Sequence, residues 1–122
     1  MAITTLGREP GGGLVVMPDV FVTVVRGALT ISAAARNNAP AVYTASNSVR
    51  NGGLLSYGGG SGADLFRRAA TYVDRILRGE KPGDLPVQFP TKYEMIMNRK
   101  AANALGLAIP PSILLRADEV IE

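Results

Sequence analysis

The sequence of 122 residues contains no cysteine, no histidine and no tryptophan. Without cysteine there is no disulfide, no thiol nucleophile and no thiolate zinc site. Without histidine there is no imidazole base and no imidazole ligand for a metal. No pair of carboxylates falls in a plausible pocket for acid–base catalysis either. These absences argue against an enzyme, and we expect no catalytic residue, no cofactor and no metal site.

Long apolar runs are also missing. No stretch reaches the roughly 18 apolar residues that cross a bilayer, so we expect no membrane insertion. Residues 1–10 lack a charged leader followed by an apolar run, which predicts that no signal peptide is present. The apolar fraction of 47% and the charged fraction of 19% are typical of a chain that folds, and the length allows one domain at most.

Clustered positive charge is scarce, although the formal net charge is +3. Only Arg67, Arg68, Arg75 and Arg78 gather, on one face of a predicted helix. A nucleic-acid site needs a basic patch with aromatic stacking partners, and a solvated helix face explains these four residues better. We therefore expect no nucleic-acid partner.

Glycine is abundant, and the richest stretch, residues 52–62, leads into the clearest helical pattern of the sequence. The helix is predicted over residues 64–78, and Gly79 ends it. Its apolar residues recur at helical spacing and predict a buried face. They are Leu65, Phe66, Ala69, Ala70, Val73, Ile76 and Leu77.

The glycine stretch formally fits a dinucleotide fingerprint, Gly58-x-Gly60-x-x-Ala63. The match is weak because the chain has 14 glycines and no acidic residue ends a second strand about 20 residues later. No lysine follows the glycines, which excludes a phosphate loop of the Gly-Lys-Ser/Thr type. A flexible connection between strand and helix is the favoured interpretation.

The remaining segments alternate between strands and helices. One or two helical turns are predicted over residues 1–6, and strands over residues 13–17, 40–44 and 53–57. The first of these strands is expected to be buried on both faces. Asp19 is predicted to cap a helix that ends at Asn37 and Asn38. Its predicted buried residues are Phe21, Val24, Val25, Ala28, Ile31, Ser32 and Ala35.

In the last third of the chain, the spacing of apolar residues changes from the helical period to every second residue. Alternation over residues 87–98 predicts a half-exposed strand, interrupted at Pro90 and lying at an edge or a crossing. Asn98 is predicted to cap a helix that reaches Leu105, and residues 113–121 are predicted to form one more helix. Strands that alternate with helices predict an α/β fold with a mostly parallel sheet. A sheet this narrow should find further strands, from a second copy or from upstream sequence.

Several segments resemble one family in order and spacing. They are GGGLVVMPD (residues 11–19), PAVY (40–43), GGLLSYG (52–58), YVDRILRGEKP (72–82), LPVQFPTKYE (85–94), ALGL (104–107), IPP (109–111) and RADEVIE (116–122). They are similar to the carboxy-terminal portion of the substrate-binding proteins of ABC transporters. The subfamily has a type I periplasmic-binding fold, and its members bind amino acids such as tryptophan or phenylalanine.

The resemblance implies that residues 1–122 are a single domain, the truncated carboxy-terminal lobe of a two-lobed receptor, with its sheet in a three-layer α/β arrangement. It also implies a small solute as ligand, an ABC permease as partner and a periplasmic location. Residues 87–98 resemble the segment that runs back toward the other lobe. The alternative is a structural fragment that forms a homodimer through faces left uncovered and binds no ligand by itself.

The resemblance places the ligand-binding residues in the loops at the strand ends. They are Asp19, Phe21, Tyr43, Thr44, Ser56, Tyr57 and Gly58. A carboxylate at Asp19 suits a ligand ammonium, and Phe21 or Tyr57 can stack on an aromatic or apolar side chain. Each has a structural alternative: Asp19 as a helix cap, Tyr43 as a core residue and Phe21 as part of the first helical turn against the core.

Overall fold

The computed structural model describes residues 2–59 and 62–122, and within them the chain forms two compact units. The residues up to Gly58 together with Glu94–Glu122 form the first unit, and the segment between them forms the second. The two units are described separately below. The single domain expected over residues 1–122 stays a prediction.

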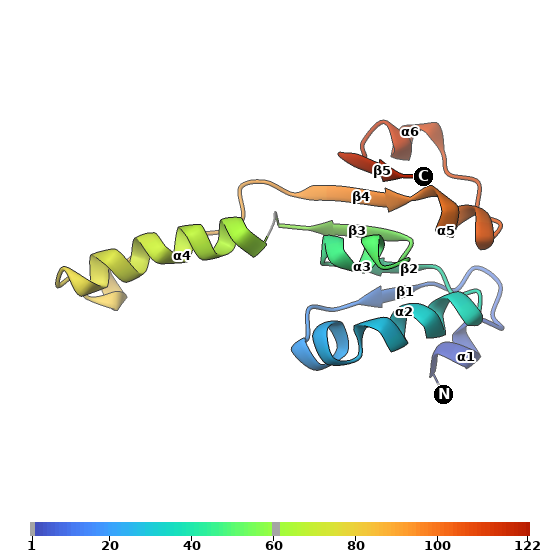
Figure 1. Ribbon diagram of the computed structural model, residues 1–122, viewed down its shortest axis with the longest axis horizontal. Coiled ribbons are helices and arrows are strands. Elements are labelled where there is room, and N and C mark those ends of the chain that lie inside the picture. The colour runs from blue at the N-terminus through green and yellow to red at the C-terminus, as the bar shows by residue number, and fades with distance from the viewer. Residues whose placement is uncertain (1, 60–61) are drawn as a thin grey trace. The chain divides into compact units, whose positions relative to one another are not determined.

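The first unit is built on a five-stranded sheet in the order β1-β2-β3-β4-β5 (Figure 1). Neighbouring strands are parallel except for β3 and β4, which are antiparallel. The strands are β1 (Leu14–Val16), β2 (Ala41–Tyr43), β3 (Leu55–Gly58), β4 (Glu94–Asn98) and β5 (Glu119–Ile121). The predicted α/β class with a mostly parallel sheet is confirmed.

Short helices connect the strands of the first unit. They are α1 (Ala2–Leu6), the π-helix η1 (Phe21–Val25), α2 (Gly27–Arg36), α3 (Ser46–Arg50), α5 (Arg99–Ala104) and α6 (Pro111–Leu114). The predicted ends of two of these helices, α2 and α5, are confirmed. Asn38 adopts φ +51° after α2, and Gly106 adopts φ +66° after α5. The Asn98 side chain caps α5, because its Oδ1 accepts a 2.9 Å hydrogen bond from the N–H of Ala101.

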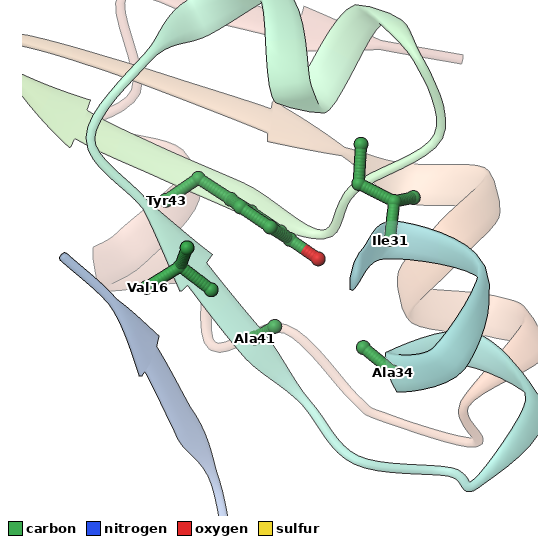
Figure 2. Close-up of a cluster of buried hydrophobic side chains, with 5 residues drawn as sticks. All are labelled: Val16, Ile31, Ala34, Ala41 and Tyr43. Carbon is green, nitrogen blue, oxygen red and sulfur yellow. The ribbon is translucent and has the colours of Figure 1, made fainter. Parts of the chain in front are cut away.

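The core of the first unit gathers between α2 and the first two strands. Figure 2 shows its buried cluster, Val16, Ile31, Ala34, Ala41 and Tyr43. Small alanine side chains let α2 approach the sheet closely, while the branched residues and the tyrosine ring fill the space between them. The expectation that β1 is buried on both faces is wrong. Val15 lies 68% exposed, because no described residue covers that face of the edge strand.

The single helix predicted from Asp19 to Asn38 is also wrong at its start. The N–H of Arg26 donates to the carbonyl of Phe21 at 2.8 Å, the i to i+5 bond of a π turn, and α2 begins only at Gly27. A π turn takes more residues than an α turn, so η1 and α2 do not share one apolar face. Ile31 is buried as predicted, whereas Phe21, Val24, Val25, Ala28 and Ala35 are exposed.

The strand predicted over residues 87–98 as half-exposed is shorter in the structure, where only β4 forms. This strand lies between β3 and β5 rather than at an edge, and Ile96, Met97 and Asn98 are buried in succession. An interior strand covered on both faces shows no alternation, which explains why the prediction was wrong.

The helix predicted over residues 113–121 is wrong as well, because α6 stops at Leu114 and β5 follows. Hydrogen bonds and an ion pair to distant residues hold this segment in the sheet as β5. Asp118 donates from its N–H to the Met95 carbonyl at 2.9 Å and accepts the Met95 N–H through Oδ2 at 2.8 Å. Arg50 of α3 forms a two-pronged ion pair with Glu119, at 2.9 and 2.6 Å.

The second unit consists mainly of α4 (Gly62–Leu77) and the 3₁₀ turn η2 (Pro82–Asp84). Gly79 adopts φ +103° and ends α4, as predicted. Arg68 donates to the Phe89 carbonyl and to the Thr91 hydroxyl at 3.4 and 3.3 Å, and the Tyr72 hydroxyl donates to the Pro86 carbonyl. These bonds hold residues 86–91 against the helix.

The buried face predicted for α4 is absent from the second unit. No residue of the helix is buried, and Phe66 and Leu77 lie 80% and 82% exposed. Amphipathic spacing identifies the face that a helix would bury against a partner, and the described part of the second unit supplies too little apolar surface to cover it. Among the described residues, no helix combines the length and the apolar character needed to cross a membrane.

Candidate functional site

The candidate site of the first unit is the edge where three parallel strands end. Val16 of β1 pairs with Tyr43 of β2, which pairs with Ser56 of β3, so these strands finish side by side. Ligands of open α/β sheets bind outside the carboxyl ends of the strands. We use the name strand-end edge for Asp19, Phe21, Thr44, Tyr57 and Gly58, the predicted residues that reach the surface there.

Thr44 and Gly58 are in direct backbone contact at this edge. A Cβ added to Gly58 would lie 2.1 Å from the Thr44 carbonyl oxygen, so only glycine allows the two strands to approach this closely. Thr44 itself is half-buried. The structure thus brings these two predicted residues together, and their role in binding stays a prediction.

Tyr43 and Ser56 lie inside the sheet rather than at its surface. Their side chains are 3% and 2% exposed, and Tyr43 belongs to the core cluster. Successive strand residues point to opposite faces, so Thr44 and Tyr57, one position further on, point away from the side that buries Tyr43 and Ser56. Burial raises the pKa of the Tyr43 phenol, which keeps it protonated and a hydrogen-bond donor at neutral pH.

Asp19 caps the helical segment that follows β1 and is exposed at the same time. Its Oδ1 accepts a 2.9 Å hydrogen bond from the N–H of Val22, and its carbonyl accepts from the N–H of Thr23 at 2.8 Å. The cap predicted from the sequence is therefore present. Capping engages one carboxylate oxygen, and the exposed side chain still presents its negative charge at the strand-end edge.

Two aromatic rings are exposed near the ends of β1 and β3. Phe21 and Tyr57 are 57% and 51% exposed. The Arg26 guanidinium lies 5.3 Å from the centroid of the Phe21 ring, a cation–π contact. Sequence reasoning missed Arg26. The two residues meet across the π turn at a spacing of five, and a pattern of 3.6 residues per turn gives no signal for that contact.

The strand-end edge combines a carboxylate, a hydroxyl and aromatic faces, and it adjoins the exposed side chains of Val20, Val24 and Val25 in the same segment. Such a surface can hold an ammonium group by charge and an apolar side chain by stacking. Across the part of the chain that the structure describes, no three potential metal-ligating side chains gather.

A family model described as "ABC transporter substrate binding protein" matches residues 2–121. The chain belongs to this family. The resemblance predicted from the sequence motifs is thereby confirmed. No curated protein sequence matches the chain significantly.

Solved structures agree with the family assignment. A conserved domain protein from Vibrio cholerae O1 biovar El Tor is similar with TM-score 0.84 and 27% identity over 98% of this chain. An ABC domain from Streptococcus pneumonia, in complex with L-Trp, gives TM-score 0.79 and 26% identity, again over 98%. A ligand-free, open substrate binding protein with adhesive properties from Clostridium difficile shows the fold alone, with TM-score 0.60 and 22% identity over 98% of this chain and 39% of its own. The chain spans 39% and 40% of the first two structures, as a portion of a family member does.

Proposed function

We propose that this chain is a solute-binding portion of an ABC transport receptor and that its strand-end edge contacts an amino acid or a similar small solute. The observation that carries the proposal is the exposed Asp19 carboxylate at the strand-end edge, in a chain of the substrate-binding family. The similar Streptococcus structure holds L-Trp, which supports an amino acid as the ligand class. The role is binding and release, without catalysis.

Each group of the strand-end edge has a complementary part in such a ligand. The Asp19 carboxylate accepts hydrogen bonds from the α-ammonium, because charge-assisted bonds are the strongest available to a zwitterion. The rings of Phe21 and Tyr57 contact an apolar or aromatic side chain. Thr44 offers a hydroxyl for the ligand carboxylate.

Membership of the family also supports a proposal for the partner and the location of the receptor. We propose that the receptor delivers its solute to an ABC permease and works outside the cytoplasm. The matched structures are more than twice as long as this chain, so a ligand held in a closed cleft contacts residues beyond these 122.

Changing Asp19 to asparagine tests the proposal. Asparagine caps a helix as well as aspartate does, so the Asp19→Asn variant keeps its fold and loses only the charge. Nuclear magnetic resonance titration with L-tryptophan is expected to shift the amide signals of Thr44 and Tyr57, with affinity about tenfold lower in the variant. Asp84→Asn, which removes an exposed carboxylate of the second unit, is the matched control and should leave the affinity unchanged.

Indole-3-propionate, which lacks the ammonium group, provides the second half of this test. It is expected to bind the wild-type chain no better than L-tryptophan binds the Asp19→Asn variant. Equal affinity of the wild-type chain for both compounds would show that Asp19 does not recognise an ammonium, and the proposed site would be wrong.

The uncovered face of α4 favours a second candidate function, a structural fragment that associates with its own copy. An apolar helix face that the described part of the second unit leaves uncovered favours self-association in water. The Phe66→Gln/Leu77→Gln variant retains good helix formers and is expected to shift the chain from larger species to monomer in sedimentation velocity. The control, Arg67→Gln/Arg78→Gln on the polar face, should leave the distribution unchanged. A wild-type chain that sediments as a monomer up to high concentration would contradict this function.

A further inference from the structure

The first unit contains a cavity of about 250 Å³ at the opposite end of its strands from the strand-end edge. The first residue of β2, Ala41, lines it, and so does the Gly52–Leu54 segment that leads into β3. The last residue of the antiparallel β4, Asn98, lines it as well. Tyr43 also lines the cavity although it ends β2, but its side chain points to the opposite face of the sheet from Thr44 and Tyr57. The cavity is therefore separate from the proposed solute site.

The wall of the cavity is mostly apolar. Ile31 and Ala34 of α2 form one side, and Ala101, Ala104 and Leu105 from α5 and its end form another. Ala104 is exposed, so it borders the opening, whereas Ala34 is 3% exposed and lies deep. Apolar walls with a few polar groups are typical of small-molecule sites.

The Tyr43 hydroxyl is the deep polar group of this cavity. The side chain is only 3% exposed, and Figure 2 shows its oxygen directed toward Ile31 of α2. Its ring packs over Gly53, where an added Cβ would lie 2.7 Å from Tyr43 Cε2. Within residues 2–59 and 62–122, the hydroxyl has no hydrogen-bond partner.

The hydroxyl therefore faces open space. No fully buried side-chain polar atom of the described residues is unpaired, so the Tyr43 oxygen must retain some accessible area, and the cavity that it lines provides that area. The phenol is therefore able to donate a hydrogen bond to an acceptor atom of a ligand that enters the cavity.

Lys100 adds a positive charge at the opening. It is exposed in the first turn of α5 and has no ion-pair partner among the residues the structure describes. Asn98 offers less, because its Oδ1 accepts from Ala101 and its Nδ2 donates to the Val49 carbonyl at 3.3 Å. The cavity thus presents a phenol donor and an ammonium to whatever enters it.

We propose that this cavity binds a small monocarboxylic acid with an apolar aliphatic chain. The aliphatic chain fills the space between α2 and α5, and the carboxylate accepts from the Tyr43 hydroxyl. The long, flexible side chain of Lys100, which also lines the cavity, turns its ammonium inward to pair with the same carboxylate. A carboxylate satisfies both groups at once, because it is negatively charged and acts only as an acceptor. The site is additional to the strand-end edge and does not depend on the function proposed for it.

Titration of the full chain with sodium hexanoate, followed by nuclear magnetic resonance, tests this site. Saturable shifts are expected at the amides of Ile31, Ala34 and Ala101. Tyr43→Phe deletes only an unpartnered oxygen and should keep the fold, while the affinity for hexanoate falls about tenfold. Lys100→Gln is expected to cause a similar loss, whereas Lys81→Gln, an exposed lysine of the second unit, should cause none.

Titration with hexan-1-ol distinguishes the contribution of the Tyr43 hydroxyl to binding from that of the Lys100 ammonium. The alcohol has an oxygen that accepts from the Tyr43 hydroxyl but carries no charge, so Tyr43→Phe should weaken its binding and Lys100→Gln should not. Ala104→Leu narrows the opening without touching either polar group, and it should abolish both titrations. Absence of saturable shifts around the cavity would overturn the proposal. So would a hexanoate affinity that is the same in the wild type and in the Tyr43→Phe, Lys100→Gln and Ala104→Leu variants. Hexanoate shifts at Thr44 and Tyr57 alone would overturn it too and would direct the ligand to the strand-end edge.

Discussion

Replacing Gly58 by alanine is expected to lower the free energy of unfolding of the chain by about 3 kcal/mol. The added Cβ would lie 2.1 Å from the Thr44 carbonyl oxygen, a backbone atom that cannot rotate away as a side chain can. Strands β2 and β3 must therefore separate where they end. Urea unfolding followed by circular dichroism measures the loss.

The same substitution should disturb the proposed solute site, because Thr44 and Gly58 both belong to the strand-end edge. Gly27→Ala is the matched control: no atom lies within 4 Å of a Cβ added there, and the residue begins α2. It should be neutral or stabilise the helix by up to about 1 kcal/mol. Equal stability of the Gly58→Ala and Gly27→Ala variants would mean that β2 and β3 do not approach each other as closely as described.

Sequence signals located most elements where their causes are local. Asn38, Gly79 and Gly106 end helices because each adopts a positive φ that glycine and asparagine tolerate. Asn98 caps α5 through its own side chain. Conformations of this kind depend on a few neighbouring residues, and those residues are visible in the sequence.

Elements selected by distant contacts were predicted wrongly. The segment Glu119–Ile121 becomes a strand because β4 offers its free edge and because Asp118 and Glu119 bind Met95 and Arg50. None of these partners is near in the sequence. The Pro-Pro-Ser segment over residues 110–112 favoured the start of a helix there, and the tertiary contacts override that preference.

The candidate site shows a similar limit. The rule that ligands bind at strand ends directs attention to Tyr43, Thr44, Ser56 and Tyr57 alike. The register, with Tyr43 beside Ser56, decides which member of each adjacent pair is buried, and register depends on pairing between strands. The sequence therefore predicted which edge of the sheet carries the candidate site. The structure shows which of the predicted residues are buried in the sheet and which face outward.

Ile96 is buried because β4 lies inside the five-stranded sheet, a position that the sequence pattern did not predict. Its side chain is 1% exposed, and its backbone pairs with Ser56 on one side and Glu119 on the other. Replacement by alanine leaves a cavity between covered strands, and Ile96→Ala is expected to cost about 4 kcal/mol of unfolding free energy.

Val15→Ala is the control for this change, since Val15 also lies on a strand but is 68% exposed, and we expect it to cost less than about 0.5 kcal/mol. Both variants are measured by urea unfolding at constant m-value. A loss of unfolding free energy below about 1 kcal/mol for Ile96→Ala would place β4 outside the core, because truncating a fully buried isoleucine side chain costs more than that. The five-stranded order would then be wrong, and the cavity bordered by Asn98 of the same strand would lose one of its walls.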